Sequence, residues 1–382
     1  MTRATTSDSE TFSEARADAL LGTFERAGYA RVKPAILQPA EPFLDLSGED
    51  IRKRMYLTTD PQGRELCLRP ELTIPVSRDY LASPLAGKAA GFCYLGPVFL
   101  HRSDGPAEFI QAGIESFGRS DIAAADAEML ALGLEATSHC GVAAPEIRIG
   151  DVGLFSALVA SLDLAPAWKR RLIKDFNHKT SLAHDLERLT LGAGNARPEY
   201  QGVLAALAGS NPKAAHALVT DLLSIAGISA VGGRSVAEIA DRFLEQSALG
   251  AQRSLPQETR LLIERFLAVR GDPDQAAAEL RALARDAKVD LDSSLDLFES
   301  RTGFLAARGI DVGRIRCATA FGRGLDFYTG FMFELHGAHN GSDGPLVAGG
   351  RYDGLLSRLG SRTPIPAVGF AVWIERFAGS PS

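Results

Sequence analysis

The chain has 382 residues, of which 46% are hydrophobic and 23% charged, as is typical of a globular protein with a substantial core and two or three domains. Its formal net charge of −6 argues against broad nucleic-acid binding, which requires a basic surface. The sequence has no apolar run of about 18 residues, and residues 1–20 are rich in Ser, Thr and acids, so neither a membrane span nor a signal peptide is expected.

Near the N-terminus the pattern predicts one helix followed by an extended segment. Residues 11–27 carry apolar residues at helical spacing and stop at Gly28, a candidate C-cap. Residues 30–43 are expected to be extended, because three prolines interrupt any regular helix there: Pro34, Pro39 and Pro42.

The next segments predict antiparallel strands. Met55–Thr59 and Glu65–Leu68 are strand-like, and Asp60–Gly63 between them is a turn, so together they predict a hairpin. Residues 90–100 and 107–118 predict two further antiparallel strands joined by a charged loop.

Composition and apolar spacing divide the rest of the chain into segments. Residues 121–139 predict a long helix that Asp121 can cap. Residues 156–311 are rich in Ala, Leu and Arg at helical spacing, whereas strand patterns return after residue 312. We therefore expect an α+β core formed by residues 1–155 and 312–382, interrupted by a mainly helical insertion at 156–311.

The cysteines and histidines give no sign of a metal or disulfide framework. The cysteines are scattered without CxxC spacing: Cys67, Cys93, Cys140 and Cys317. This pattern indicates reduced thiols in a cytoplasmic protein. His336 and His339 lie close together but without a carboxylate arrangement, so a solvated loop is a simpler interpretation than a metal site.

Several segments, taken in order, resemble the catalytic core of the histidyl-tRNA synthetases and their paralogues: LCLRPELT, FIQAGIESFG, GRGLDFYTGFMFE, AGGRYDGLLSRLG and PAVGFAVWIERF. The resemblance covers roughly residues 1–155 and 312–382. It implies a class II aminoacyl-tRNA synthetase-like fold, in which a six- or seven-stranded antiparallel sheet is flanked by helices, and it implies a dimer.

The same resemblance implies a pocket for histidine. A histidine site needs acceptors for the ammonium, a cation for the carboxylate and partners for the imidazole, because buried charges must be paired. The residues carried over for these roles are Glu71, Thr73, Gln111, Glu115, Arg323 and Tyr328. Glu71 and Thr73 would face the ammonium, Gln111 would lie between ammonium and carboxylate, and Arg323 would bind the carboxylate. Glu115 and Tyr328 would flank the imidazole.

Taken without the resemblance, these residues have ordinary alternative interpretations. Glu71 and Arg69 can form a surface ion pair, and Tyr328 in an aromatic strand can belong to the core. Gln111 and Glu115 are four apart, so on one strand they face the same side, which is consistent with the pocket without proving it.

The residues that would hold ATP in such a synthetase are changed. Leu100 stands where the synthetases have the arginine for the α-phosphate, and Arg102 stands where they have a glutamate that reads adenine. Trp373 replaces a glycine against which adenine stacks, whereas Arg376, the counterpart of the γ-phosphate arginine, is kept. The loop between Phe99 and Gln111 is also shorter. A re-registered loop would let Arg102 take over the phosphate role, so that alternative stays open.

Only six residues follow Arg376, so no anticodon-binding domain is expected. Within the resemblance, these departures look most like the family of ATP phosphoribosyltransferase regulatory subunits. Membership would imply a non-catalytic subunit without a cofactor, forming a homodimer within a hetero-oligomer. It would also imply a short-form catalytic subunit as partner and histidine as feedback effector. The alternatives are a stand-alone, ATP-dependent histidine-activating ligase and, less favoured, a synthetase-like binding module.

Overall fold

The computed structural model describes residues 17–46, 48–103, 105–176, 179–191, 217, 220–221, 256–322, 327–337 and 344–377. Internal contacts divide the chain into two units, which are treated separately here. The first comprises Met1–Ala157 and Phe266–Ser382, and the second comprises Leu158–Arg265. Residues 266–311, which the sequence pattern assigned to the insertion, thus group with the first unit. The sequence-based domain boundaries remain a prediction.

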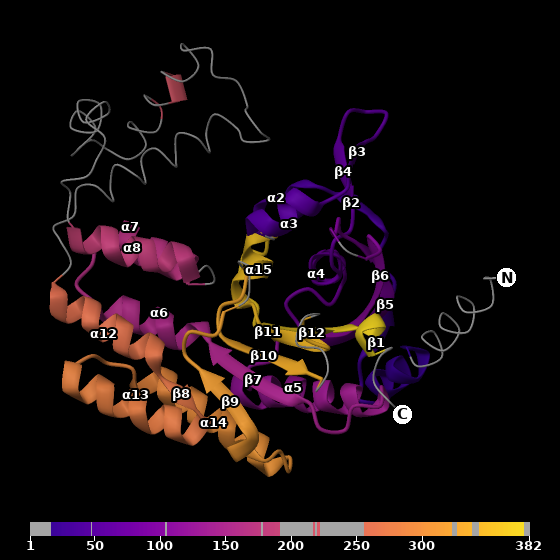
Figure 1. The fold of residues 1–382 in the computed structure, drawn as a ribbon. Helices are drawn as coiled ribbons and strands as arrows, with labels where there is room; N and C mark the ends of the chain where they lie inside the picture. The colour runs from indigo at the N-terminus through magenta and orange to yellow at the C-terminus, as the bar shows by residue number, and fades with distance from the viewer. Residues whose placement is uncertain are drawn as a thin grey trace. The chain divides into compact units, whose positions relative to one another are not determined.

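A sheet of nine strands among the described residues forms the centre of the first unit (Figure 1), in the order β1-β5-β6-β12-β11-β10-β7-β9-β8. The strands are β1 (Ala30–Val32), β5 (Ala90–Phe99), β6 (Glu108–Phe117), β12 (Ala367–Trp373), β11 (Val347–Arg351), β10 (Phe331–His336), β7 (Glu146–Asp151), β9 (Ile315–Ala318) and β8 (Arg270–Gly271).

Most neighbouring strands of this sheet pair antiparallel, which confirms the predicted α+β class. The exceptions are the parallel pairs β1–β5 and β7–β9. The sheet has more strands than the family resemblance implied, because short strands extend it at both edges. β5 and β6 lie where two antiparallel strands were predicted, with Phe99 opposite Glu108 next to the loop.

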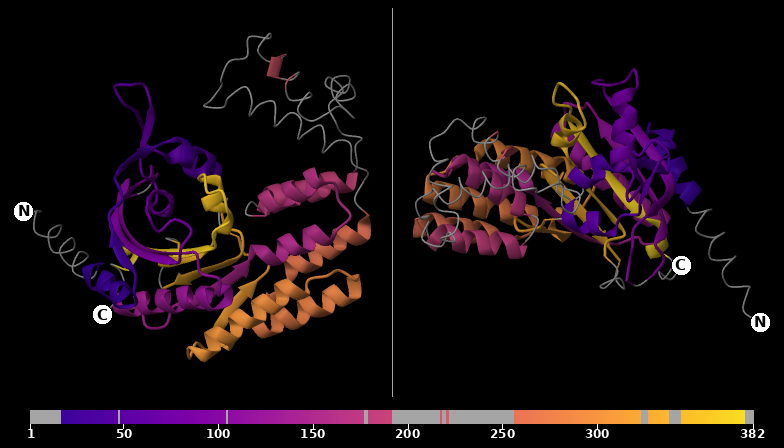
Figure 2. Two further views of the ribbon diagram at one scale, coloured as in Figure 1. Left: turned by 180° about the vertical axis from the view of Figure 1, so that it is seen from behind. Right: turned by 90° about the horizontal axis from the view of Figure 1, so that it is seen from above.

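Helices cover the two faces of this sheet. Helix α5 (Ile122–His139) packs on β10, β11 and β12, where Gly133 lies against Phe333, Leu335 and Val347. Helix α4 (Thr73–Ala82) lies on the opposite face, and its Tyr80 stacks on Phe117 of β6 with ring centroids 4.4 Å apart. Seen from behind, β5 and β6 curve around α4 (Figure 2).

A small second sheet precedes α4. It has the order β2 (Leu37–Pro39), β4 (Glu65–Leu68) and β3 (Leu57–Thr59). Strands β3 and β4 confirm the predicted hairpin, and the Gly63 amide donates to the Asp60 carbonyl at 2.9 Å in its turn. Helices α2 (Glu41–Leu46) and α3 (Gly48–Arg54) lie between β2 and β3 in the chain.

Two local predictions were wrong. The segment 30–43 is not extended throughout, because α2 begins at Glu41 and Pro42 lies in its first turn, where a missing N–H removes no helical hydrogen bond. Asp121 does stand at the N-cap position of α5, but its side chain accepts no helix amide. Both of its oxygens instead accept from the Arg119 guanidinium, at 3.0 and 2.6 Å.

A buried network of ion pairs connects the elements around α5. Arg301 of α14 (Asp292–Ala307) donates to Asp126 and to Asp151, at 2.9 Å in each case. Arg351 donates to the other Asp126 oxygen at 2.8 Å and to Asp353 at 2.9 Å. Asp126 and Arg301 are almost completely buried, so each charge depends on its partners. Helix α13 (Pro273–Ala287) packs beside α14, and α15 (Asp353–Arg358) follows β11.

The described part of the second unit is helical, in agreement with the helical spacing of apolar residues in this part of the sequence. Helix α7 (Pro166–Asp175) and helix α8 (Lys179–Leu191) are joined by Arg171, which donates to Asp175 and Asp185 at 2.7 Å each. Helices α6 (Val152–Ser161) and α12 (Gln257–Ala268) span the boundaries of the two units. None of the helices in the described ranges is both long and apolar enough to cross a membrane.

Candidate functional site

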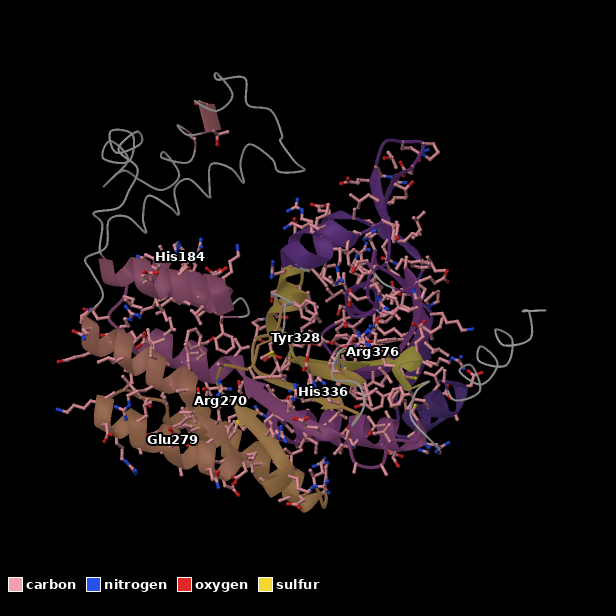
Figure 3. All side chains as sticks on the ribbon, viewed as in Figure 1. His184, Arg270, Glu279, Tyr328, His336 and Arg376 are labelled. Atoms are coloured by element: carbon pink, nitrogen blue, oxygen red, sulfur yellow. The ribbon has the colours of Figure 1, made fainter. Side chains whose placement is uncertain are left out.

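The predicted histidine and nucleotide residues meet at one cavity of about 280 Å³ on the α4 face of the large sheet. From the first set, its lining contains Glu71, Thr73, Gln111 and Tyr328. From the second set, it contains Leu100, Arg102, Trp373 and Arg376. Tyr328 and Arg376 are labelled in Figure 3. The volume lies near the lower end of the range for small-molecule pockets, which begins at about 300 Å³.

Strand register places the key side chains on one face. β6 and β12 pair so that Gln111 is opposite Trp373, Gly113 opposite Ala371, and Glu115 opposite Gly369. Since alternate residues of a strand share a face, all six face the same side of the sheet. The spacing of Gln111 and Glu115 seen in the sequence therefore has the predicted consequence.

Glu71 stands at the start of α4, at the wall of the cavity. Its Oε2 accepts from the Thr73 amide at 2.6 Å and its Oε1 from the Ile74 amide at 2.9 Å. The carboxyl group thus satisfies two N–H groups of the first helical turn. Burial raises the pKa of Glu71 to about 7, although these hydrogen bonds oppose the shift. Each oxygen keeps a lone pair that a ligand ammonium can use.

The side-chain oxygen of Gln111 is a buried hydrogen-bond acceptor that no donor in the described structure satisfies. Its side chain is 4% exposed, and its Oε1 has no hydrogen-bond partner in the described structure. A buried acceptor left unsatisfied costs about 1–3 kcal/mol, so this atom favours a ligand that brings an N–H group. Together, Gln111 and Glu71 can surround an ammonium.

Glu115 does not line the cavity directly. Its carboxylate is 1% exposed, and it accepts from the Tyr94 hydroxyl at 3.2 Å through Oε1 and from the Tyr352 hydroxyl through Oε2. Burial is the main cause that raises the pKa of Glu115 to about 8. Glu115 is connected to the cavity through Tyr352, which does line it, and a role for Glu115 beside a ligand remains a prediction.

Sequence reasoning missed Tyr352, although it stands in the AGGRYDGLLSRLG segment that carried the resemblance. The pairing of Glu115 with Gly369 across the sheet also explains why residue 369 is a glycine. A Cβ atom at Gly369 would overlap the Glu115 Oε2, so the glycine of the PAVGFA segment makes room for the carboxylate. Arg323 lies outside the described residues. Tyr328 lines the cavity, with its ring centroid 5.0 Å from that of Phe327.

The predicted nucleotide residues lie at one part of the cavity lining, where two of them contact each other. The Arg376 guanidinium lies over the Trp373 ring at 4.6 Å and donates to the Pro345 carbonyl. Leu100 is buried and offers no donor to a phosphate. The Trp373 indole lines this part of the cavity, and its place at a former base-stacking position remains a prediction.

Two further residues of the lining, Arg54 and Phe109, had no predicted role. Arg54 is the last residue of α3, in a run of three basic residues. Phe109 lies on β6, and the Arg102 guanidinium stacks over its ring at 3.8 Å. A strand position two residues before Gln111, and therefore on the same face, was a signal for Phe109, whereas nothing local in the sequence marked Arg54.

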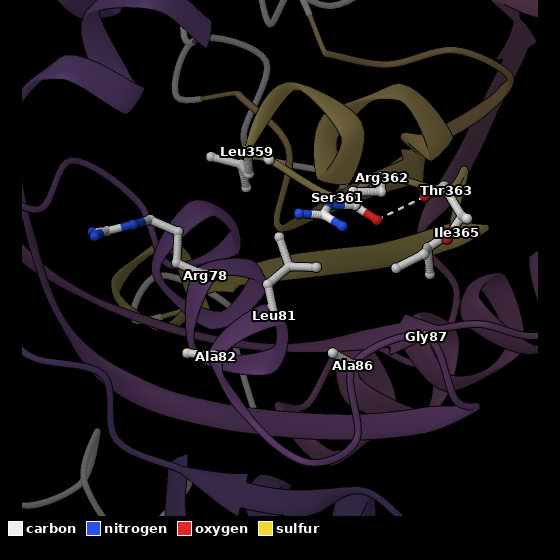
Figure 4. Close-up of a pocket in the computed structure, with 11 residues that line it drawn as sticks. Arg78, Leu81, Ala82, Ala86, Gly87, Leu359, Ser361, Arg362, Thr363 and Ile365 are labelled. Atoms are coloured by element: carbon white, nitrogen blue, oxygen red, sulfur yellow. Dashed lines mark hydrogen bonds between the residues drawn. The ribbon is translucent and has the colours of Figure 1, made fainter.

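A larger cavity of about 510 Å³ lies between α4 and the loop after α15 (Figure 4). None of the predicted site residues lines it. Arg78 donates to Gln38 at 2.8 Å, and Ser361 donates to the Thr363 carbonyl at 2.7 Å, so these two polar groups of the lining are used within the protein. Among the described residues no cluster of three or more His, Cys, Asp or Glu could hold a metal ion. His336 contacts Glu334 at 2.9 Å, and His339 lies outside the described residues.

Comparison with known proteins identifies the relatives of the chain. Residues 6–242 and 214–377 match the family described as Histidyl-tRNA synthetase. A protein from Brucella ovis, named ATP phosphoribosyltransferase regulatory subunit, is 42% identical over 350 residues, which cover 90% of this chain and 91% of that protein. A relative from Brucella abortus with the same name matches to the same extent.

Solved structures with the same fold include three that cover nearly the whole chain. An ATP phosphoribosyltransferase regulatory subunit/histidyl-tRNA synthetase from Bacillus halodurans has a TM-score of 0.68 at 22% identity, over 100% of this chain and 81% of that one. A histidine–tRNA ligase subunit from Alicyclobacillus acidocaldarius has a TM-score of 0.58 at 22% identity, over 100% and 95%. A histidyl-tRNA synthetase from Nostoc has a TM-score of 0.61 at 17% identity, over 96% and 70%. These likenesses establish the class II synthetase-like fold.

Proposed function

Because the chain belongs to the family of ATP phosphoribosyltransferase regulatory subunits, we propose that it is the non-catalytic regulatory subunit of this enzyme, which begins histidine biosynthesis. The chemistry, the joining of ATP to phosphoribosyl pyrophosphate, belongs to a short-form catalytic subunit. The chain forms a homodimer within the hetero-oligomer, activates the catalytic subunit and takes part in its feedback inhibition by histidine. It acts in the cytoplasm.

The observation that carries the proposal is the contrast between the two parts of the cavity. On one side, the free acceptor of Gln111 and the carboxyl group of Glu71 suit an ammonium. On the other side, Leu100 and Trp373 stand where an ATP-using relative needs an arginine and a glycine. A site that keeps the amino-acid contacts but loses the nucleotide contacts suits a sensor of histidine better than an enzyme that activates it.

In the proposed complex, the histidine ammonium lies at Glu71, Thr73 and Gln111. The imidazole lies at Tyr328 and Tyr352, and Tyr352 links it to the carboxylate of Glu115. Arg323 binds the carboxylate of the ligand. Histidine can shift an equilibrium between active and inhibited assemblies only by its difference in affinity for the two, so the pocket must change between them.

The central experiment mixes the chain with a short-form ATP phosphoribosyltransferase and measures product formation. We expect activity only in the mixture, and inhibition by histidine. Calorimetry on the assembled complex then compares Glu115→Gln and Arg323→Ala with the exposed control Glu187→Gln. Both pocket variants should weaken histidine binding about tenfold: Arg323→Ala removes a charge-assisted hydrogen bond, and Glu115→Gln changes the partner of the Tyr352 hydroxyl.

Two results would count against the proposal. Unchanged histidine binding in both pocket variants would place the regulatory site elsewhere in the complex. Histidine-dependent exchange between ATP and pyrophosphate by the chain alone would instead support the stand-alone ligase.

A further inference from the structure

We propose that histidine and protons compete at this cavity: Glu71 and Glu115 hold a proton between them while the cavity is empty, and the ammonium of the ligand displaces that proton to the solvent. Feedback by histidine is then stronger at higher pH. The inference rests on the proposed function, because it takes histidine as the ligand. It adds a second chemical signal, pH, to the regulation of the same site.

The two carboxyl groups are linked through one threonine. Glu71 is half-buried in the cavity wall, whereas Glu115 is 1% exposed behind Tyr352. The Thr73 side chain interacts with both carboxyl groups, and the charge of Glu71 acts on Glu115. Two carboxylates that share a partner away from water cost free energy unless one of them is neutral. The arrangement therefore favours a proton on the pair.

Within the described residues, no ion pair neutralises either acid. Arg69 is near Glu71, but its guanidinium donates to two backbone carbonyl groups instead, at 2.8 and 2.5 Å. No hydrogen bond or ion pair among the described residues joins either acid to the remaining cations of the cavity lining, which are Arg54, Arg102 and Arg376. The empty pair thus lacks the positive partner that two buried carboxylates require.

Hydroxyl groups surround Glu115 in place of cations. Tyr94 donates to its Oε1 at 3.2 Å, and Tyr352 donates to its Oε2. Burial raises the pKa of both tyrosines, so they remain protonated donors. These donors only partly offset the burial that raises the pKa of Glu115 to about 8, and the pKa of Glu71 is raised to about 7. Near neutral pH the empty pair therefore carries fewer than two negative charges.

A ligand ammonium supplies the missing cation. It can accept the lone pairs that Glu71 keeps beside its two amide contacts, next to the unsatisfied Oε1 of Gln111. A nearby positive charge favours the ionised carboxylates, so binding lowers their pKa values and releases a proton to the solvent. By linkage, the affinity for histidine rises with pH from about 6 to about 8, and it becomes constant where both acids are ionised without a ligand.

Calorimetry counts the released protons when histidine binding to the full chain is measured in buffers with different ionisation enthalpies. At about pH 7.5 most of the free imidazole is already neutral, so the count reports on the chain. The parent chain should release about one proton per histidine, and Glu115→Gln less than about half of that. The control Glu187→Gln, exposed on α8, should match the parent.

A second variant keeps both carboxyl groups. Tyr94 does not line the cavity, and Tyr94→Phe removes one donor to Glu115. The pH at which the affinity becomes constant should then rise by about one unit, because the charged carboxylate loses a hydrogen bond. Tyr80→Phe, the matched control, should leave it unchanged, since the Tyr80 hydroxyl donates to the Lys88 carbonyl. Infrared difference spectra provide a direct measurement: histidine should remove the band of protonated carboxyl groups from the parent chain.

Four results would overturn this proton linkage. They are the absence of histidine binding, binding without proton release, proton uptake, and equal release by the parent and Glu115→Gln. Uptake would assign the exchanged proton to the imidazole of the ligand rather than to the acid pair. Failure of the regulatory role is a separate result, because a chain that releases a proton on binding histidine can still fail to activate a catalytic subunit.

Discussion

Glu115 of β6 and Gly369 of β12 are direct partners across the sheet, and the carboxylate lies in the space that a side chain at Gly369 would fill. The carboxylate can therefore sit under Tyr352 and Tyr94 only while residue 369 lacks a Cβ atom. One backbone position thus determines the place of the buried acid behind the proposed imidazole site.

Gly369→Ala should displace this carboxylate. We expect a loss of about 1–3 kcal/mol in the free energy of unfolding, as for overpacked cores, together with weaker histidine binding. Urea denaturation and calorimetry measure the two effects. Gly303→Ala is the control, because a Cβ atom there meets no neighbour within 4 Å in the interior of α14. It should stabilise the chain by about 0.5–1 kcal/mol. Equal stability of Gly369→Ala and the parent chain would contradict the packing argument.

Tyr352→Phe removes the hydroxyl that connects the cavity to Glu115. We expect histidine affinity to fall about tenfold, because the buried carboxylate loses one donor and the ligand loses its link to it. Tyr80→Phe serves as the matched control, since the Tyr80 hydroxyl donates to the Lys88 carbonyl at 2.8 Å, and Tyr80 does not line the cavity. If both variants bind histidine equally well, Tyr352 has no part in recognition.

The buried ion pairs around Asp126 should matter more than those on the surface. Asp126→Ala leaves Arg301 and Arg351 without a shared partner in the core, and we expect a loss of about 3–5 kcal/mol in unfolding free energy. Asp296→Ala, which removes an exposed partner of Arg281, should cost less than about 1 kcal/mol. If thermal and urea denaturation gave comparable losses for the two variants, burial would not determine how much these ion pairs stabilise the fold.

Stability should also depend on pH through the cavity acids. The folded chain raises the pKa of Glu71 to about 7 and that of Glu115 to about 8, from an ordinary value of 4.5. Between these limits the unfolded chain binds fewer protons, so the free energy of unfolding decreases as pH rises from about 5 to about 8. Glu115→Gln should flatten this slope by at least about 1 kcal/mol across the interval, since one pKa unit corresponds to about 1.4 kcal/mol. Urea denaturation at several pH values tests this, and an unchanged slope in the variant would exclude Glu115 as its source.

The sequence predicted well what local patterns determine. The hairpin of β3 and β4, the strands β5 and β6, and the helix α5 all occur where alternation and helical spacing placed them. The gathering of Glu71, Thr73, Gln111 and Tyr328 was available only through the family resemblance, because they come from different segments of the chain.

The predictions that were wrong or incomplete concern groups with competing hydrogen-bond partners, or contacts between residues that are far apart in the chain. Asp121 was expected to cap α5, but a guanidinium two residues away is the stronger partner for its carboxylate. Strand spacing gave the face on which Glu115 lies, yet it does not show that Tyr352 stands between this acid and the cavity. Likewise, no local pattern pairs Arg376 with the Pro345 carbonyl, 31 residues earlier in the chain.

The glycines beneath the cavity are required by packing, independently of any ligand. Added atoms at Gly113 or Gly369 would strike the Tyr94 hydroxyl and the Glu115 carboxylate, so folding alone is enough to retain both glycines. Because packing alone requires these glycines, their presence in a chain gives little information about whether that chain is a catalyst. Differences in function are instead expected at residues of the cavity lining such as Leu100 and Trp373, where a substitution changes which ligand the cavity admits.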